Sequence, residues 1–340
     1  MTENFSKALT VPVKKEEKQE EKDKKTKLEG YINILNQDFV RHRPAILFEN
    51  YIGRGSYGYV FSGKFDYEGQ KEVAIKIMKP HLLKTKDPMD LKDIKKRFMN
   101  ECVIQYDLSQ KLYKIVKVYD YGEFGNYRFM ITELMSNKNL RYVINDYRNY
   151  LLKDRVSIMI DIAEILSEIH KRGIIHRDLK PENSLFSKKT YIIEEGEKKR
   201  FEGERIIKLT DLGIIRWIQA HSPAEKTDII GTPDYMSPEQ VNDPHIIDHR
   251  TDIFSFGVVF YELLNGEYPR KTEKNTEDRL EYVSRLVNIP AKDFVNINPN
   301  INGLNDIVMK CIAKGPSDRY QYMDKVIIDL KDYYNRKFVA

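Results

Sequence analysis

The pattern of hydrophobic and polar positions begins with a long charged stretch and then changes to predicted folded structure. Residues 1–28 include the run KKEEKQEEKDKKTK and show no apolar periodicity. Such a segment cannot bury enough surface to offset the entropy lost on folding, so we expect a disordered tail. An isolated charged helix and a binding tail are the alternatives. Apolar residues return over 31–46, which predicts a short leader packed on the first domain.

Short apolar and alternating runs predict strands over the following hundred residues, interrupted by one helix. The segments 51–62, 71–78, 114–124 and 127–135 have strand-forming patterns, whereas 91–112 has apolar residues at helical spacing. Further along, 152–171 predicts an amphipathic helix that ends before Gly173. The segment 252–264 predicts a helix ended by Gly266, and because it is apolar all round we expect it at the centre of the second domain.

Composition narrows the class of protein. The chain has 57 basic and 52 acidic residues, and this mild, dispersed excess of positive charge does not favour nucleic-acid binding. No run approaches the roughly 20 apolar residues of a membrane helix, and the charged N-terminus is unlike a signal peptide. The two cysteines, Cys102 and Cys311, lie far apart in apolar helical contexts. We therefore expect core cysteines without a disulfide, no membrane span and a cytoplasmic protein.

The segment 174–183, IIHRDLKPEN, combines groups suited to phosphoryl transfer. The Asp178 carboxylate can deprotonate a hydroxyl, the Lys180 ammonium can neutralise a phosphoryl oxygen, and the Asn183 amide oxygen can ligate Mg²⁺. Taken alone, such a motif is usually a polar surface turn after a strand. The other motifs of the chain give it weight.

A glycine-rich segment and a strand lysine precede this loop. Residues 53–58 read GRGSYG, and strand-forming residues follow Gly58, where a dinucleotide-binding fingerprint would open a helix. Glycine lets the backbone approach phosphates closely. Lys76 lies inside the apolar strand 71–78, where a solvent-facing edge lysine is the ordinary interpretation. Glu101 lies in the helix 91–112, where a solvated glutamate is the ordinary interpretation.

Taken in order over residues 46–335, these motifs resemble the protein kinase family. HRD with Asn183 resembles the catalytic loop, VAIK the strand with the phosphate-binding lysine, and DLG at 211–213 the family's Asp-Phe-Gly with Leu replacing Phe. GTPDYMSPE at 231–239 resembles the end of an activation segment, with Ser237 replacing the usual Ala. Lys180 and the Gly-Thr at 231–232 resemble the Ser/Thr-specific branch, most closely its bacterial-type members.

The resemblance implies an α+β, two-lobed kinase fold. The leader and a small β-rich N-lobe would span 29–135, and a larger, mainly α-helical C-lobe would span 136–340. It implies ATP and Mg²⁺ as cofactors and proteins as substrates. Two alternatives remain open: an ATP-binding pseudokinase scaffold and a small-molecule kinase on a related fold.

The resemblance also assigns roles to residues. Asp178 would orient the acceptor hydroxyl, and the further catalytic residues would be Lys180, Lys76, Glu101 and Thr232. Asn183 and Asp211 would be the metal ligands. The expected nucleotide-binding residues lie in the glycine-rich segment, the lysine strand, the hinge and the adenine floor: Ile52, Gly53, Gly55, Ser56, Gly58, Val60, Ala74, Lys76, Glu133, Met135 and Leu185.

Two further expectations concern the insertion at 187–204 and the residue partner of Glu239. The insertion is polar and rich in Lys and Glu where the family has a tight hairpin, which predicts a lengthened hairpin loop. By resemblance, Glu239 should pair with Arg319.

A last expectation concerns switching. Thr227 falls close to the family's phosphorylated threonine, which predicts autophosphorylation, with self-association of two copies. Arg177 and Arg216 would grip the phosphate, with Ser222 a weaker phosphorylation candidate. Asp228 could instead fill that pocket without modification.

Overall fold

The computed structural model describes residues 29–39, 41–54, 58–78, 88–136, 138–188, 191–195, 198–202, 205–212, 233–242, 247–269, 301 and 303–339. The chain divides into two compact units, Met1–Lys84 with Gly122–Leu134 and Thr85–Tyr121 with Met135–Ala340. Residues 85–121, which the sequence assigns to the N-lobe, therefore group with the second unit. The expected boundary between the lobes after Met135 stays a prediction.

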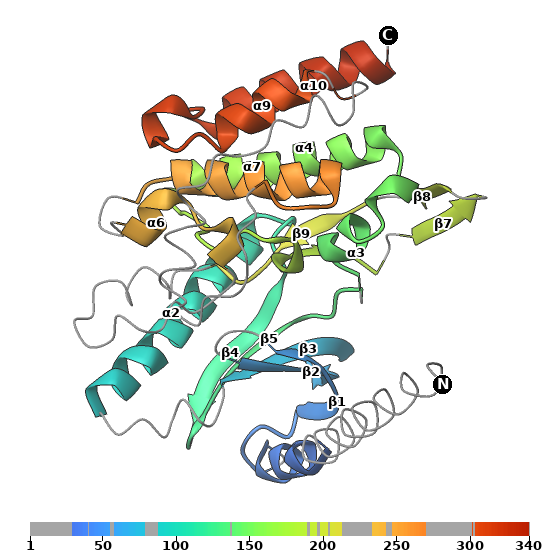
Figure 1. The fold of residues 1–340 in the computed structure, drawn as a ribbon. Coiled ribbons are helices and arrows are strands. Elements are labelled where there is room, and N and C mark those ends of the chain that lie inside the picture. Colours follow the sequence, from blue (N-terminus) through green and yellow to red (C-terminus); the bar gives the residue numbers. More distant parts are fainter. Residues whose placement is uncertain are drawn as a thin grey trace, which may run out of the picture. The chain divides into compact units, whose positions relative to one another are not determined.

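A five-stranded antiparallel sheet makes up most of the first unit, although the first residues of β4 are counted in the second, and all four predicted strand regions contribute to it (Figure 1). Its spatial order is β1 (Ile46–Arg54), β2 (Gly58–Asp66), β3 (Gln70–Met78), β5 (Tyr127–Glu133) and β4 (Val118–Phe124). The apolar side chains of Phe61, Val73, Ile75, Ile77 and Phe129 are fully buried along it. The strand pattern in the sequence is therefore confirmed.

The predicted leader is a helix over residues 29–39 that packs on the first unit. Leu35 and Phe39 are fully buried, and the ring of Phe39 lies 4.8 Å from that of Phe48 in β1. Ile34, which falls on the other side of the helical period, is exposed. The Asn36 amide both donates to the Phe48 carbonyl oxygen at 2.9 Å and accepts from the Phe48 N–H at 2.8 Å.

The second unit is mainly helical. Among its described residues, the helices are α2 (Pro88–Lys111), α3 (Leu140–Ile144), α4 (Leu152–His170), α6 (Pro238–Asn242), α7 (Arg250–Asn265), α9 (Leu304–Cys311) and α10 (Met323–Phe338). Short 3₁₀ turns are η2 (Tyr147–Asn149), η3 (Pro181–Asn183), η4 (Pro233–Tyr235) and η7 (Pro316–Asp318). Its strands form two antiparallel pairs, β6 (Ser184–Phe186) with β9 (Ile207–Leu209) and β7 (Tyr191–Glu195) with β8 (Lys198–Glu202).

Helix α7 is the centre of this unit, as its sequence predicts. Every residue over 251–264 is buried, and α7 contacts α3, α4 and α9 (Figure 1). Gly266 ends it with a left-handed φ of 73°, which favours glycine. A Cβ atom at that position would also lie 2.2 Å from a ring carbon of Tyr147.

Within the insertion at 187–204, the described residues include two strands, so part of the expected lengthened hairpin loop is regular structure. Strands β7 and β8 pair antiparallel, with Ile192 opposite Phe201. The Phe201 ring packs against Tyr150 and Phe186, at centroid distances of 5.7 and 5.3 Å. These contacts with residues distant in sequence stabilise strand structure that the polar composition of the segment does not predict.

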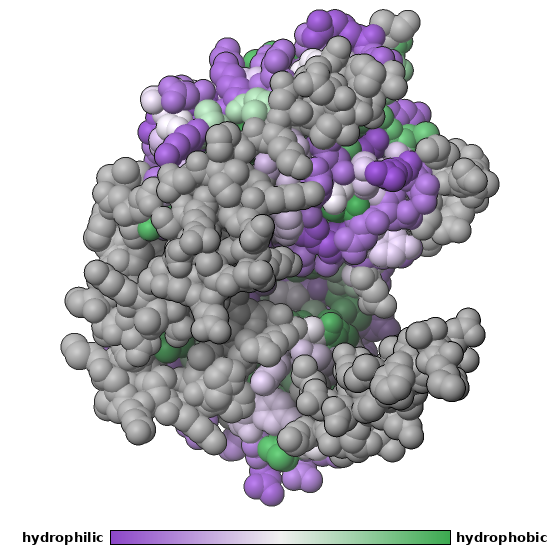
Figure 2. Space-filling model, in the orientation of Figure 1, coloured by the Kyte–Doolittle hydropathy of each residue, from purple (hydrophilic) through white to green (hydrophobic). Residues whose placement is uncertain are grey.

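The described residues have a mainly polar surface, buried cysteines and no membrane-spanning helix. Hydrophilic residues predominate among the coloured residues of Figure 2. Cys102 and Cys311 are both buried, as expected of core cysteines. Among the helices of the described part of the chain, none combines the length and the apolar character that crossing a bilayer requires.

Candidate active site

The structure brings together the three side chains singled out in the loop at 174–183. Lys180 Nζ lies 3.1 Å from Asp178 Oδ2. Asn183 Nδ2 donates to the Asp178 backbone oxygen at 2.9 Å and to its Oδ2 at 3.3 Å. All three side chains are largely shielded from solvent. A carboxylate, an ammonium and an amide therefore converge at one place, as phosphoryl transfer requires.

A buried aspartate on α7 holds the start of this loop. Asp252 Oδ2 accepts from the His176 N–H at 2.7 Å, and Asp252 Oδ1 accepts from the Arg177 N–H at 2.8 Å. His170 Nε2 lies 2.8 Å from Asp252 Oδ2. Burial alone would raise the pKa of Asp252, but the hydrogen bond and charge of His170 hold that pKa below its usual value. Arg177 has a left-handed φ of 63°, which for a non-glycine residue costs about 1–2 kcal/mol.

Burial has the opposite consequence for the catalytic-loop histidine. His176 is fully buried, and burial lowers the pKa of its imidazole despite the nearby carboxylates of Asp252 and Asp178. His176 Nδ1 accepts from the Asp178 N–H at 3.4 Å. A neutral imidazole can accept this bond, whereas an imidazolium cannot. His176 therefore supports the backbone of the loop.

The pairing of β6 with β9 places the two predicted metal ligands close together along the backbone. Asn183 directly precedes β6, and Ser184 pairs with Leu209 near the end of β9. The Thr210 N–H donates to the Asn183 carbonyl oxygen at 3.1 Å, and Asp211 follows Thr210. Asp211 has a left-handed φ of 54°, which is strained for a residue with a side chain.

The donor set fits a hard divalent cation that is also held by phosphates. Both hydrogens of the Asn183 amide nitrogen face Asp178, which leaves Asn183 Oδ1 as the atom able to ligate a cation. Together with the Asp211 carboxylate it offers oxygen ligands, which Mg²⁺ prefers. Among the described residues, no group of three or more His, Cys, Asp or Glu could hold a metal alone. Mg²⁺ commonly takes only one or two protein carboxylates and completes its shell with water and phosphate oxygens.

The first unit holds the predicted phosphate-binding lysine in the middle of its sheet. Lys76 is buried in β3, opposite Val60 of β2 and Met130 of β5. Ala74 lies on the same strand, opposite Thr132. A Cβ atom at Gly58 would lie 2.9 Å from the Ile77 oxygen and 3.0 Å from Lys76 Cγ. Gly58 is thus required by its own sheet.

The other predicted nucleotide-binding residues are distributed over both units. Ile52 is exposed on β1, and a Cβ atom at Gly53 would have open space around it. Glu133 ends β5 in the first unit. In the second unit, Met135 is buried and Leu185 lies in β6, bridged to Asn139.

The predicted partner of Lys76 lies in the second unit. Glu101 is buried on α2, so its ordinary interpretation as a solvated helix residue is wrong. The C-terminal half of α2 packs within this unit, where Leu108 belongs to the main hydrophobic core. Because Lys76 and Glu101 belong to different units, their ion pair stays a prediction.

Several predicted residues lie outside the described part of the chain. These are the glycine-loop residues Gly55 and Ser56, the DLG glycine Gly213, and the activation-segment residues Arg216, Ser222, Thr227, Asp228, Gly231 and Thr232. Their roles stay predictions, as does the disordered tail over 1–28.

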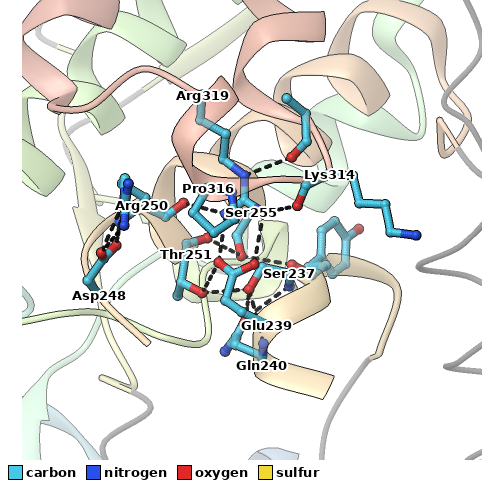
Figure 3. A network of polar contacts seen from close by, with 12 residues as sticks. Ser237, Glu239, Gln240, Asp248, Arg250, Thr251, Ser255, Lys314, Pro316 and Arg319 are labelled. Carbon is cyan, nitrogen blue, oxygen red and sulfur yellow. Dashed lines mark hydrogen bonds and ion pairs between the residues drawn. The ribbon is translucent and has the colours of Figure 1, made fainter. Parts of the chain in front are cut away.

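A buried polar network follows the activation segment (Figure 3). Arg319 donates two hydrogen bonds to Glu239, at 2.6 and 2.8 Å, which confirms the predicted pair. Burial would raise the pKa of Glu239, but the Arg319 hydrogen bonds and charge lower it below its usual value. Thr251 Oγ1 donates to Glu239 Oε1 at 2.9 Å and lies 2.5 Å from Ser237 Oγ. Ser237 therefore contributes a hydroxyl bond that alanine could not make.

A second network joins the catalytic loop to η4 and α7. The Arg141 guanidinium donates to Glu182 at 2.8 Å and also bonds Glu262 and Tyr235. Tyr235 donates to Glu262 Oε2 at 2.6 Å. Burial raises the pKa of Glu262 despite Arg141. Glu182 lies directly before Asn183, so this network holds the C-terminal end of the loop, whereas Asp252 holds its start.

Sequence reasoning missed Gln240 and the anchoring role of Asp252. Gln240 Nε2 donates to the Arg177 carbonyl oxygen at 2.9 Å. Both residues hold the backbone of the catalytic loop, and backbone contacts from distant elements leave little trace in local sequence. An aspartate at the start of an otherwise apolar helix was the one signal available, because a buried charge needs partners.

Comparisons with known proteins agree with this arrangement. Residues 47–328 match the protein kinase domain. A probable serine/threonine-protein kinase of Clostridium perfringens is 31% identical over 281 residues, which cover 82% of this chain and 37% of that protein. A probable serine/threonine-protein kinase PknB of Lactococcus lactis is 27% identical, with 82% and 40% covered. The serine/threonine-protein kinase PknB of Mycobacterium tuberculosis is 26% identical, with 79% and 40% covered. The chain thus spans about two fifths of the length of these curated relatives. The match over most of the chain, together with the catalytic loop and the two-unit α+β fold, shows that this chain belongs to the protein kinase family.

Proposed function

We propose that this chain is a serine/threonine protein kinase that transfers the γ-phosphoryl group of ATP to Ser or Thr hydroxyls of proteins. The convergence of Asp178, Lys180 and Asn183 within one braced loop carries the proposal. The names of the similar bacterial proteins support the Ser/Thr specificity. A pseudokinase scaffold would not need the carboxylate and ammonium held so close together.

In the proposed reaction the acceptor hydroxyl oxygen bonds to the γ-phosphorus, and the bond between that phosphorus and the β–γ bridging oxygen breaks. Asp178 orients the hydroxyl and takes its proton as ADP leaves. Lys180 neutralises charge on the transferred group. Lys76 binds the α and β phosphates, and Thr232 helps to place the acceptor. Positioning and charge stabilisation supply most of the rate enhancement.

Asn183 Oδ1 and the Asp211 carboxylate would hold Mg²⁺. The metal supplies charge neutralisation at the phosphate oxygens when it is bound. The nucleotide would lie against Ile52, Gly53, Val60, Ala74 and the other residues assigned to it above. We further propose that two copies associate to phosphorylate Thr227 in trans.

The test is transfer of labelled phosphate from Mg-ATP to a generic Ser/Thr-rich protein and to the kinase itself, with phosphosites mapped by mass spectrometry. Asp178→Asn is the matched variant, because it keeps the shape of the side chain and removes the base. We expect it to fold normally and to lose about 10²–10³-fold in kcat.

The outcomes separate the alternatives. Phosphoserine and phosphothreonine on the protein support the proposal. Tight Mg-ATP binding with no transfer would instead identify a pseudokinase. Transfer to small hydroxylated metabolites alone would identify a small-molecule kinase. Near-full activity of Asp178→Asn would show that the base is misassigned.

A further inference from the structure

The peptide bond between Arg177 and Asp178 is held by two side chains, one from outside the loop and one from within it. Its carbonyl oxygen accepts from Gln240 Nε2 at 2.9 Å. Its N–H donates to His176 Nδ1 at 3.4 Å. The preceding N–H, that of Arg177, is held by Asp252 on α7. Of the two hydrogen bonds to this peptide group, the one from Gln240 on α6 is the shorter. The peptide group directly precedes the Asp178 side chain, so holding it helps to orient that side chain.

The Gln240 amide can point in only one way. Its Oε1 accepts from the Ser237 N–H at 3.0 Å, and a backbone N–H can only donate. The amino group must therefore face the Arg177 oxygen, as the geometry has it. Ser237 Oγ lies 3.4 Å from the same Oε1 and 2.5 Å from Thr251 Oγ1 (Figure 3).

This orientation is reinforced by the buried ion pair behind it. Thr251 donates to Glu239, which Arg319 holds through two hydrogen bonds. The network runs from Arg319 through Glu239, Thr251 and Ser237 to the amide of Gln240 (Figure 3). Arg177 has a left-handed φ of 63°, which is strained for a residue with a side chain. The hydrogen bond from the fixed Gln240 amide stabilises this backbone conformation.

We propose that Gln240 is a positioning residue for phosphoryl transfer, which sets the orientation of Asp178 by holding the Arg177 carbonyl oxygen. The inference rests on the proposed kinase activity. It predicts that Gln240 acts on turnover and not on nucleotide binding, because its contacts lie with the loop backbone and the segment at 237.

The first test is Gln240→Glu, which keeps the acceptor for Ser237 and replaces the donor with an oxygen that faces the Arg177 carbonyl oxygen. We expect kcat to fall at least about tenfold with the KM for ATP within about twofold, since small misplacements of a reacting group cost up to ~10²-fold. Gln321→Glu is the matched control. Gln321 also donates to backbone carbonyls, but these belong to Ser317 and Arg319 and not to the catalytic loop. Its kcat should stay within about twofold of wild type.

A pH series separates positioning from a general structural defect. A protonated carboxyl can donate to the Arg177 oxygen, so the kcat of Gln240→Glu relative to wild type should rise as the pH falls from about 8 to about 5.5. The ratio for Gln321→Glu should stay flat. The charged groups of the polar network around this side chain include Glu239 on its own helix, Arg319, Arg250 and Asp248 (Figure 3). On the side of the loop, the titratable groups are His176, Arg177 and Asp178, with Asp252 of α7 behind them. The lowered pKa values of Glu239 and Asp252 keep these carboxylates ionised over this range, and burial lowers the pKa of His176.

Hydrogen–deuterium exchange gives a readout that does not need activity. Peptides covering 174–183 should exchange faster in Gln240→Glu than in wild type or Gln321→Glu, while β3 in the first unit stays unchanged. If Gln240→Glu does not fold, Gln240→Met replaces it, with the same expected loss of kcat and no recovery at low pH.

Three results would overturn the inference. One is a kcat within about twofold of wild type in a folded Gln240 variant. Another is an equal loss of kcat in Gln321→Glu. The third is unchanged exchange over 174–183 in the Gln240 variants. A wild-type protein that transfers no phosphate would count against the proposed function instead, and the exchange comparison would still decide the role of Gln240.

Discussion

Gln105 donates from Nε2 to Thr210 Oγ1 at 3.2 Å, so α2 is hydrogen-bonded to the residue directly before Asp211. Gln105 is fully buried, and its Oε1 has no hydrogen-bond partner among the residues that the structure describes. The sequence places this polar residue on the inward face of the helix, where an apolar side chain is usual. The hydrogen bond explains why a glutamine is accommodated there.

Substituting Gln105 tests whether the hydrogen bond of its Nε2 offsets the cost of burying its Oε1 without a partner in the described part of the chain. Gln105→Leu should change the free energy of unfolding by less than about 1 kcal/mol, because the lost bond is offset by removal of a buried unpaired carbonyl. Gln105→Glu should destabilise by more than about 2 kcal/mol, because it buries a carboxyl. Urea unfolding measures both. Gln110→Glu on the exposed face of α2 is the control, and an equally large loss there would contradict this explanation.

The pair of Glu239 and Arg319 should dominate the stability of the second unit. Arg319→Met leaves the buried Glu239 carboxylate without a counter-charge and should cost about 3–5 kcal/mol, whereas Glu239→Gln with Arg319→Met should recover part of that loss. Denaturant unfolding of the two variants measures the difference. A double variant as unstable as the single one would contradict the prediction.

The lowered pKa of Glu239 also predicts a dependence of stability on pH. Because the pKa of Glu239 is lower in the folded state than the ordinary value of 4.5 in an unfolded chain, the contribution is fully present above that value. It is lost as the pH falls through the folded pKa. Wild type should therefore lose more stability on acidification than Glu239→Gln. Parallel acid dependence of the two proteins would argue against the shift.

Two glycines of the predicted nucleotide loop should respond differently to alanine. A Cβ atom at Gly58 collides with the β3 backbone, so Gly58→Ala should destabilise the protein by about 1–3 kcal/mol. Gly53 has open space, so Gly53→Ala should stay within about 0.5 kcal/mol of wild type. If Gly53 approaches ATP, its variant should still raise the KM for ATP. Melting curves measure the effect of each variant on stability, and the KM for ATP measures its effect on nucleotide binding.

Thr227 lies outside the described residues, and its role is tested by activity. If its phosphorylation switches the kinase, Thr227→Ala should lower activity at least ~10-fold, equivalent to ~1.4 kcal/mol. Asp228→Ala is the matched comparison. Unchanged activity in the first variant with a large loss in the second would assign the pocket to the aspartate.

The sequence predicted those features whose signals are local. The strands, the amphipathic helix α4 and the end of α7 at Gly266 follow from periodicity and from a left-handed residue that favours glycine. Resemblance supplied the pairing of Glu239 with Arg319. The packing of Phe201 in β8 against Tyr150 and Phe186, and the contact of Gln240 with Arg177, join residues that lie far apart in the sequence. Local patterns do not encode such contacts.

The two hydrogen bonds between the Asn36 amide and the Phe48 backbone affect whether another chain can pair with the edge of the sheet. Strand β1 lies at one edge of its sheet, and an exposed edge is a template on which another chain can add a strand. The Asn36 amide uses both the donor and the acceptor of Phe48. An incoming strand would have to displace this side chain together with the buried Leu35 and Phe39. The leader helix thereby covers the edge of β1 at Phe48, where another chain could otherwise add a strand.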